Sequence, residues 1–324
     1  MNTIARNRTG VLLVNLGSPE APEFFSIRRY LREFLSDSRV IETNRMAWWL
    51  ILNGFILNLR PFKLVKLYRS IWTNEGSPLK VESLKQIQAL QEKLGQDYVV
   101  SLGMRYGQPS LYAGLQMLQK SKVSKIIVLP LYPQYAGATT GSAFDAVTRV
   151  LQGWRYLPEL KFISDYHSHP TYLQAMKIKI EAFWAIHGKP QQFILSFHGL
   201  PKSYCEKGDP YGAQCQKTAQ LLAESLGLLE EEWAISFQSR VGKMAWLTPY
   251  TEVLLKSLPG KGIRHIHVFC PGFSVDCLET LEEIEMRNKA FFLGSGGKSY
   301  QYIPALNSTS EHIQMMEDLI LTRE

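Results

Sequence analysis

The sequence predicts an α/β protein of two similar lobes, each with a parallel β-sheet covered by helices. Two observations support this class. Short apolar runs bounded by turn residues are typical of buried parallel strands, and stretches with apolar residues at helical spacing separate them. The same alternation occurs in both halves of the 324 residues, a length that suits two ordinary domains.

The first half contains one clear β–α–β unit. A strand is expected over residues 10–17, and further strands are expected over 98–102 and 125–131. Residues 110–121 lie between the last two strands, and their leucines have helical spacing. The crossover between these parallel strands should be right-handed.

The second half repeats this pattern. The expected strands are 160–163, 192–196, 233–238 and 263–269, and the expected helices are 170–187, 214–226 and 311–321. We therefore expect lobes over residues 1–160 and 161–324, with the last helix packing back on one of them. No GxGxxG motif follows a strand, and the glycine-rich residues 294–297 lack that context, which disfavours a nucleotide-binding oxidoreductase.

Composition narrows the class of partner. The formal net charge of +7 favours an anionic partner, such as an acidic lipid surface or an acidic small molecule. Nucleic acid is not expected, because lysines and arginines are scattered and no nucleic-acid-binding motif is present. The four cysteines form no CxxC pair and no secretory signal precedes them, so we expect reduced cysteines and a cytoplasmic protein.

Residues 46–59 are unusually apolar and include the pair Trp48 and Trp49. The stretch is too short, and too interrupted by Asn and Gly, to span a bilayer. It is flanked by basic residues, which are Arg45, Arg60, Lys63 and Lys66. Two interpretations are open: an apolar surface that contacts a membrane or lines the lip of a ligand cleft, or an ordinary core helix.

His198 is the first candidate for chemistry. It follows the expected strand 192–196, where open α/β sheets place ligands. Gly199 and Pro201 predict a tight turn that would present its ring at the end of the strand rather than in the core. A single histidine in such a place is more often a hydrogen-bonded structural residue, so the case depends on a second group.

That second group is acidic and consists of Asp276, Glu279 and Glu283. If a helix begins near Asp276, these side chains at i, i+3 and i+7 share one face. Asp276 could instead only cap the helix, with Glu279 completing a capping box. Carboxylates held close together raise one another's pKa, which suits proton transfer or loose binding of a divalent cation.

Other candidates are weaker. Arg105 and Tyr106 follow a strand, where the arginine could bind an anion or merely pair with a carboxylate. The loop that contains Tyr135 is rich in aromatic and hydroxyl side chains and could line a flat apolar ligand. Trp246 could do the same or could simply fill the core.

Seven motifs together resemble those of the ferrochelatase family, in the family's order and over nearly the whole chain. They are Asn-Leu-Gly-Ser-Pro-Glu at 15–20, Gly-Ser-Pro-Leu at 76–79, Leu-Tyr-Pro-Gln-Tyr at 131–135 with Thr-Thr-Gly at 139–141, Ser-Phe-His-Gly-Leu-Pro at 196–201, Gly-Asp-Pro-Tyr at 208–211, Phe-Gln-Ser-Arg at 237–240 and Asp-Cys-Leu-Glu-Thr-Leu at 276–281. The chain is most similar to ferrochelatases of Gram-negative bacteria.

The resemblance implies insertion of ferrous iron into protoporphyrin IX, the last step of haem synthesis. It implies two Rossmann-like lobes of the type II chelatase kind, with the porphyrin in the cleft between them. By motif matching, His198 and Glu279 correspond to the family's metal-site pair on opposite sides of the macrocycle, and Asp276 and Glu283 continue the acidic path. The porphyrin-binding set would contain Leu16, Tyr135 and Trp246, with Arg60, Lys63 and Ser77 near the propionates.

The resemblance also sets expectations about cofactors and partners. The chain carries no cysteine extension like the one that holds a [2Fe–2S] cluster in animal-type members, so no cluster and no permanent cofactor are expected. Cys277 stands where several relatives have histidine, which removes one potential metal ligand. The expected partners are protoporphyrin IX, Fe²⁺, the cytoplasmic face of the inner membrane, and the oxidase that precedes this step in haem synthesis.

Two rival functions remain open on the residues themselves. A chelatase that inserts cobalt into another tetrapyrrole would share the chemistry, although the motifs around His198 and Glu279 favour iron. A non-catalytic porphyrin or haem carrier would need the aromatic residues of the cleft but not the His198 and Glu279 pair.

Overall fold

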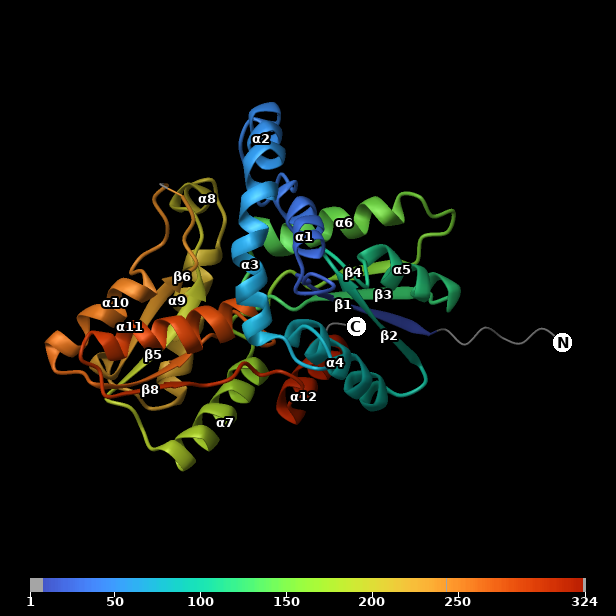
Figure 1. Ribbon diagram of the computed structural model, residues 1–324. Helices are drawn as coiled ribbons and strands as arrows, with labels where there is room; N and C mark the ends of the chain where they lie inside the picture. The colour runs from blue at the N-terminus through green and yellow to red at the C-terminus, as the bar shows by residue number, and fades with distance from the viewer. Residues whose placement is uncertain (1–7, 243, 323–324) are drawn as a thin grey trace. The chain divides into compact units, whose positions relative to one another are not determined.

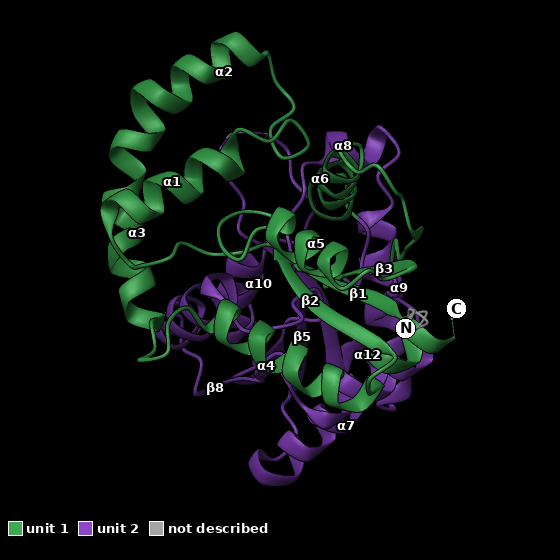
Figure 2. Ribbon diagram, turned by 90° about the vertical axis from the view of Figure 1, so that its right-hand side faces the viewer, with its two compact units in different colours: residues 1–132, 136–165, 316–324 green, residues 133–135, 166–315 purple. Residues whose placement is uncertain are grey.

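The computed structural model describes residues 8–242 and 244–322, which form two compact units (Figures 1 and 2). Among the described residues, unit 1 comprises 8–132, 136–165 and 316–322. Unit 2 comprises residues 133–135 and 166–315. Each unit contains one four-stranded parallel sheet, so the predicted α/β class with two helix-covered parallel sheets is confirmed.

The sheet of unit 1 has the strand order β2-β1-β3-β4. Its strands are β1 (Thr9–Asn15), β2 (Tyr98–Met104), β3 (Lys125–Pro130) and β4 (Glu159–Phe162). The helices beside them are α4 (Pro78–Leu94), α5 (Leu111–Lys120) and α6 (Ser142–Leu151), with the short π-helix η2 (Gly137–Gly141) before α6. The central strand β1 is buried on both faces, which explains its unbroken apolar run.

A helical arm precedes this set in unit 1. It consists of α1 (Phe24–Leu35) packed against a long run made of α2 (Arg45–Ile51), the π-helix η1 (Leu52–Ile56) and α3 (Leu57–Ile71) (Figure 2). Pro61 lies inside α3 and has no N–H to donate to the carbonyl of Leu57. Arg28 of α1 supplies the missing donor, because its Nε lies 3.2 Å from Leu57 O. The same contact therefore satisfies the freed carbonyl and fastens α1 to α3.

The sheet of unit 2 repeats the order of unit 1, as β6-β5-β7-β8. Its strands are β5 (Gln192–His198), β6 (Trp233–Gln238), β7 (His265–Phe269) and β8 (Ser299–Tyr302). Its helices are α7 (Pro170–His187), α8 (Lys202–Glu206), α9 (Tyr211–Ser225), α10 (Thr251–Ser257), the π-helix η5 (Glu279–Asn288) and α11 (Lys289–Gly294), with 3₁₀ turns η3 (Glu230–Glu232) and η4 (Pro259–Lys261). The last helix, α12 (Ser310–Leu321), begins in unit 2, and its residues from 316 onward belong to unit 1. Because β5 and β7 are central, the segments that follow them begin at neighbouring points of one sheet edge.

The fourth strand of each sheet is where the structure differs from the expectation. The strand expected over 160–163 belongs to the sheet of unit 1, because Lys125 of β3 pairs with Glu159 of β4. The fourth strand of unit 2 is β8, for which no strand was expected. Apolar periodicity indicates that a segment is a strand, but it does not indicate which strand it pairs with. Strand β8 has only four residues and follows a glycine-rich turn, so its pattern is too short to be distinctive.

His267 makes the stability of unit 2 sensitive to acid. Its side chain lies on β7 at 5% exposure, packed edge to face against Phe183 at 5.5 Å, and its Nδ1 is buried without a hydrogen-bond partner. Burial, together with the charge of His187, lowers its pKa from 6.5 to about 4. The unfolded chain therefore takes up a proton between pH 6.5 and 4 that the folded chain does not.

The expected result is a loss of stability as the pH falls through this window. Between pH 7 and pH 5, protonation of His267 in the unfolded chain should lower the free energy of unfolding by about 2 kcal/mol. His267→Phe should reduce the pH dependence of urea-induced unfolding by that amount, whereas His265→Phe, at an exposed position on the same strand, should not. Equal pH dependence in His267→Phe and the wild type would contradict the assignment.

Candidate active site

His198 is the last residue of β5, and its ring is exposed at the end of the strand. Its Nδ1 lies 2.7 Å from the carbonyl oxygen of Gly199. A carbonyl only accepts, so Nδ1 carries the proton and donates it, and the lone pair of the ring is on Nε2. The carbonyl of His198 accepts a hydrogen bond from the Tyr211 hydroxyl at 2.9 Å, which holds the strand end from the other side.

Gln238 and Ser239 connect His198 to the acidic segment. Gln238 ends β6 directly opposite His198, and its carbonyl accepts from the Gly199 N–H at 2.7 Å. Its side-chain amide donates to the carbonyl of Glu279 at 3.1 Å and accepts from Ser196 at 2.7 Å. Gln238 and Ser239 lie within the motif at 237–240, but a glutamine at the end of a strand does not by itself indicate a role, so neither residue was a candidate for the site.

Ser239 holds the carboxylate of Glu283. Its backbone N–H donates to Glu283 Oε1 at 2.9 Å, and its hydroxyl donates to Glu283 Oε2. Ser239 has a φ of +65°, a left-handed conformation that turns the chain away from the sheet. The structure thus brings His198, Glu279 and Glu283 to the same edge of the sheet of unit 2. Gln238 and Ser239, at the end of β6, make the hydrogen bonds that connect them.

The acidic segment is a π-helix and not the α-helix that was expected to begin near Asp276. Helix η5 spans Glu279–Asn288 and contains Glu279 and Glu283, whereas Asp276 precedes it. The i→i+5 pattern also places Glu282 beside Arg287, which form an ion pair at 2.7 Å. Periodicity could not reveal the wider helix, because over ten residues it differs little from an α-helix in sequence. π-Helical turns occur frequently at functional sites.

Asp276 is buried at 7% exposure and anchors the start of this helix. Its Oδ1 accepts from the Tyr302 hydroxyl at 2.6 Å and from the Thr280 hydroxyl at 3.0 Å, and its Oδ2 accepts from the Asn307 amide at 2.8 Å. Its side chain therefore joins the end of β8 and the segment after it to the first turn of η5. The capping role considered for Asp276 is not observed, because Leu278 is the residue that precedes η5 and no side chain caps the helix there. Asp276 is a structural residue of another kind, held by side chains that include two distant in sequence.

Cys277 lies beside Glu279 and is not an available thiolate. Its side chain is 5% exposed. Burial first, and then the charge of Glu279 and a hydrogen bond to it, raise the pKa of the Cys277 thiol well above its ordinary value. At neutral pH the thiol is therefore protonated and interacts with the Glu279 carboxylate rather than offering a metal ligand.

Trp246 lies next to His198 within unit 2. Its indole N–H donates to the Val241 carbonyl at 3.0 Å, and its ring packs on Gly199, where an added Cβ would lie 3.0 Å from the ring. The residue after His198 must therefore be small. Tyr135 is half-buried in the same unit, and its backbone N–H donates to Gln214 Oε1 at 2.6 Å.

Leu16, Arg105 and Tyr106 meet at the carboxyl ends of β1 and β2 in unit 1. The Tyr106 N–H donates to the Leu16 carbonyl at 2.9 Å. Of the two roles considered for Arg105, the structure shows the pairing with a carboxylate, because its guanidinium contacts Asp37 and its Nε donates to Ser142 Oγ at 2.6 Å. The Tyr106 hydroxyl donates to the same Asp37 carboxylate at 2.8 Å.

This network determines the charge of Asp37. Burial alone would raise its pKa, but hydrogen bonds from Ser142, the Arg39 backbone and Tyr106, with the charge of Arg105, outweigh burial and lower the pKa below 3.8. The phenol of Tyr106 is itself 1% exposed, and burial raises its pKa above the ordinary value of 10. Arg105 therefore forms an ion pair with Asp37 within unit 1, and the neutral phenol of Tyr106 donates a hydrogen bond to the same carboxylate.

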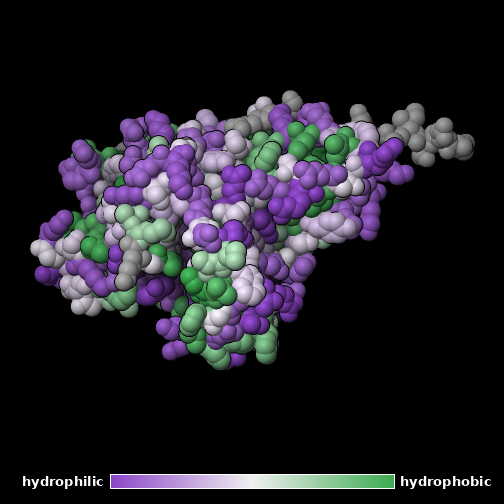
Figure 3. All heavy atoms as spheres, turned by 90° about the horizontal axis from the view of Figure 1, so that it is seen from above, coloured by the Kyte–Doolittle hydropathy of each residue, from purple (hydrophilic) through white to green (hydrophobic). Residues whose placement is uncertain are grey.

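The residues expected near the propionates lie elsewhere in unit 1. Arg60 and Lys63 are exposed one turn apart on α3, whereas Ser77 is 4% exposed at the start of α4. The arm that carries Arg60 and Lys63 exposes seven large apolar side chains, at 46–81% each, which we call the apolar lip: Met46, Trp49, Leu50, Ile51, Phe55, Leu59 and Phe62. Figure 3 views the molecule from the side to which α2 points in Figure 1, and hydrophobic side chains are grouped on that face.

Because most of the large apolar side chains of residues 46–59 are exposed, this segment is not an ordinary core helix. Leu52 and Leu57 are buried, and Trp48 is half-buried with its indole N–H on the Leu35 carbonyl at 2.7 Å. Trp48 thus fastens α2 to α1, while Trp49 is 62% exposed. No helix within the described ranges is long and apolar enough to cross a membrane.

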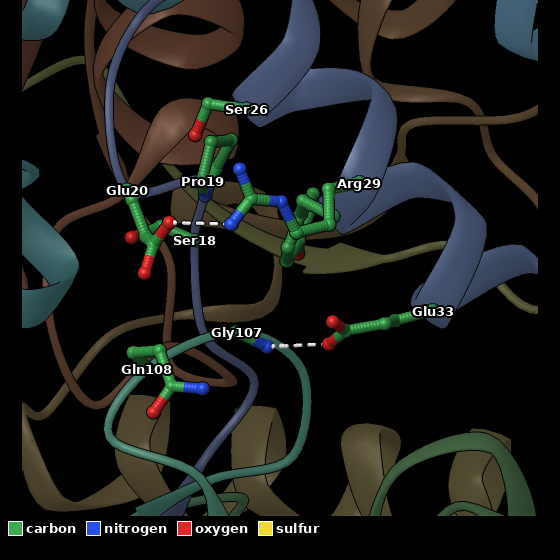
Figure 4. A pocket seen from close by; sticks show the side chains of 9 residues that line it. Ser18, Pro19, Glu20, Ser26, Arg29, Glu33, Gly107 and Gln108 are labelled. Carbon is green, nitrogen blue, oxygen red and sulfur yellow. Dashed lines mark hydrogen bonds and ion pairs between the residues drawn. The ribbon is translucent and has the colours of Figure 1, made fainter.

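A small pocket in unit 1 contains none of the predicted site residues (Figure 4). Its lining comes from the loop after β1, from α1 and from the loop after β2: Ser18, Pro19, Glu20, Ser26, Arg29, Tyr30, Glu33, Gly107 and Gln108. Glu20 pairs with Arg29 at 3.0 Å, and Glu33 accepts from the Gly107 N–H at 2.8 Å. Its charged groups are thus already bonded, Glu20 and Arg29 to each other and Glu33 to a backbone N–H.

Comparison with known proteins agrees with these motifs. The ferrochelatase family model matches residues 8–324. The ferrochelatase of Methylococcus capsulatus is 52% identical over 316 residues, which are 97% of this chain and 96% of that protein. Ferrochelatase 2 of Shewanella oneidensis is 50% identical over 323 residues, 99% of both chains, and the ferrochelatase of Nitrosococcus oceani is 51% identical over 322 residues, 98% and 87% of the two.

Two solved structures share the fold of this chain. SirB from Bacillus subtilis with Fe³⁺ has a TM-score of 0.58 at 12% identity, over 96% of this chain and 95% of that chain. CbiX, described as the terminal enzyme for biosynthesis of siroheme in denitrifying bacteria, has a TM-score of 0.53 at 10% identity, over 98% and 100%. At these identities the likeness concerns the fold alone, whereas the match over residues 8–324 and the relatives near 50% identity place the chain in the ferrochelatase family.

Proposed function

We propose that this chain inserts ferrous iron into protoporphyrin IX through the edge of unit 2 that carries His198, Glu279 and Glu283. Iron insertion into protoporphyrin in haem synthesis is the activity of the family to which the chain belongs. The observation that supports this particular site is the His198 ring, whose Nδ1 donates to the Gly199 carbonyl and whose lone pair is therefore on Nε2, at the same sheet edge as two carboxylates.

The reaction requires a base at this position. When Fe²⁺ replaces the two pyrrole N–H protons of the porphyrin, both protons must leave the macrocycle. Nε2 of His198 can accept a proton, and the bond from Nδ1 to Gly199 keeps the ring oriented while it does so. The resulting imidazolium would be stabilised by the nearby carboxylates of Glu279 and Glu283.

The carboxylates are suited to presenting iron without retaining it. No three His, Cys, Asp or Glu side chains within the described part of the chain converge as a metal site. Glu283 is held by Ser239, and Glu279 interacts with the Cys277 thiol, so each carboxylate is oriented by its own partner. An incomplete ligand set suits a substrate ion that must pass to four pyrrole nitrogens, because a closed set would bind it permanently.

An anaerobic absorbance assay of Fe²⁺ insertion into protoporphyrin IX tests this function. The wild type should convert the porphyrin to haem with multiple turnovers, and Co²⁺ with sirohydrochlorin should be a poor substrate pair. Porphyrin binding without turnover would instead favour a carrier. Faster insertion of Co²⁺ into sirohydrochlorin than of Fe²⁺ into protoporphyrin IX would favour a cobalt chelatase. Absence of porphyrin binding would contradict the proposal.

We further propose that the substrate set includes Leu16, Tyr135 and Trp246 for the porphyrin face and Arg60, Lys63 and Ser77 for its propionates. Arg60 and Lys63 are exposed cations beside the apolar lip, which suits an apolar ligand with acidic groups. The proposal also includes the absence of an iron–sulfur cluster. All four cysteines are free, and burial raises the pKa of three of them, Cys215, Cys270 and Cys277, well above the ordinary value.

The apolar lip is proposed to contact the cytoplasmic face of the inner membrane. Exposed aromatic side chains with a basic border are typical of interfacial helices, and Arg45, Lys63 and Lys66 are exposed beside them. A membrane contact would let poorly soluble porphyrin and haem enter or leave without crossing water. The same face could meet the oxidase that supplies the porphyrin.

Removing two aromatic side chains of the apolar lip should weaken this contact. Trp49→Ser with Phe55→Ser should reduce co-sedimentation with vesicles of phosphatidylethanolamine and phosphatidylglycerol by tenfold or more, on the order of 1.5–3 kcal/mol per buried aromatic side chain. Leu157→Ser, at a 59% exposed residue outside the lip, is the matched control and should bind like the wild type. Equal loss in both variants would contradict a lip-specific contact.

A further inference from the structure

We infer that Asn307 is a positioning residue for iron insertion, because it fixes the segment from which the acidic helix η5 begins. The inference rests on the proposed function of Glu279 and Glu283. It assigns a role to the stretch between β8 and α12, which contains none of the family motifs and none of the candidate site residues.

Asn307 makes three hydrogen bonds to residues 274–276. Its backbone N–H donates to the Ser274 carbonyl at 3.0 Å. Its side-chain oxygen accepts from the Asp276 N–H at 2.8 Å, and its side-chain amide donates to Asp276 Oδ2 at 2.8 Å. The side chain thus binds both the backbone and the carboxylate of one residue, which leaves that residue little freedom to rotate or shift.

The backbone of Asn307 is suited to this place. Its φ of +51° lies in the left-handed region, which asparagine tolerates better than most non-glycine residues. His312, 1% exposed on α12, fixes it further, because its Nδ1 lies 2.6 Å from the Asn307 carbonyl. Since that carbonyl can only accept, Nδ1 is the donor.

The chain of contacts reaches the proposed iron ligand. Asp276, held by Asn307, accepts from the Thr280 hydroxyl at 3.0 Å, and that hydroxyl in turn accepts from the Cys277 N–H at 3.0 Å. Thr280 is the neighbour of Glu279 at the start of η5. A displacement of residue 276 would therefore move the first turn of the π-helix, and with it the Glu279 carboxylate, without touching the residues around a bound porphyrin in unit 2.

Asn307→Gly tests this role. Glycine accepts the left-handed φ and keeps the backbone bond to Ser274, while the variant removes the two side-chain bonds to Asp276. The expected result is a rise in KM for Fe²⁺ of about tenfold and a lower kcat, with the dissociation constant for protoporphyrin IX within twofold of the wild type. The control is Ile180→Ala, which removes buried apolar atoms from α7 in the same unit and should lower the melting temperature without changing KM for Fe²⁺.

A second pair of variants covers the case in which Asn307→Gly fails to fold. His312→Leu removes the donor to the Asn307 carbonyl, whereas His312→Asn places an amide N–H near the position of Nδ1. The asparagine variant should recover at least half of the iron-specific loss that the leucine variant shows.

The outcomes separate the inference from the function on which it rests. A lower melting temperature with KM for Fe²⁺ unchanged in Asn307→Gly, or equal KM values in the two His312 variants, would overturn the positioning role. Normal KM for Fe²⁺ in Glu279→Gln would instead remove the proposed role of Glu279, and the inference with it.

Discussion

His198→Ala is expected to lower kcat for iron insertion by about 10²–10⁴-fold while porphyrin binding is retained. The variant removes the only base proposed to take the pyrrole protons, whereas the porphyrin would still contact Tyr135 and Trp246. His198 is exposed at the end of β5, so its replacement should change the unfolding free energy by no more than about 0.5 kcal/mol. Turnover is measured anaerobically from the absorbance of the product, and binding from quenching of tryptophan fluorescence.

Two controls make this result specific. His265→Ala removes another exposed histidine of unit 2 and should leave kcat unchanged. His265 is the first residue of β7, whereas His198 is the last residue of β5. Added imidazole should restore part of the activity of His198→Ala, because it replaces the missing base. Near-normal turnover in His198→Ala would show that the protons leave by another group.

Glu279→Gln is expected to lower kcat/KM for Fe²⁺ by about 10²-fold and to leave the dissociation constant of the porphyrin unchanged. Glutamine keeps the shape of the side chain but loses the negative charge that attracts a divalent ion. The hydrogen bond from the side-chain amide of Gln238 to the backbone carbonyl of Glu279 would remain, so η5 should keep its place.

Glu285→Gln is the matched control on the same π-helix, since Glu285 is exposed and has no proposed role. Its steady-state constants should stay within twofold of the wild type. A similar loss in both variants would indicate that the summed negative charge of η5 attracts Fe²⁺, and would contradict a direct ligand role for Glu279.

The sequence was sufficient to predict the sheets but not all of their strands. The apolar runs of β1, β3, β5 and β7 are buried on both faces, which makes them easy to recognise. The edge strands β4 and β8 have four residues each and are only partly buried. The sequence predicted β4 to within one residue but not the sheet it joins, and it did not predict β8. Pairing is decided by contacts between residues distant in sequence.

The candidate site shows the same division. That His198 and the acidic segment each follow a buried strand could be predicted from the sequence. The structure pairs those two strands, β5 and β7, and so places both segments at one sheet edge. The π-helix, the protonation of Nδ1 and the bonds of Asp276 could not, because each depends on a partner such as Gly199, Asn307 or Tyr302 in its folded position. The pairing of Arg105 with Asp37 likewise depends on residues 68 positions apart.

A double-variant cycle of His198→Ala and Glu279→Gln in the anaerobic insertion assay tests the central claim most directly, which is that the two residues serve one reaction step. Groups that act as a unit show losses that are far from multiplicative. We predict that the double variant loses little more kcat/KM for Fe²⁺ than the more damaging single variant. A loss equal to the product of the two single losses would show that the residues act independently and would contradict a shared site.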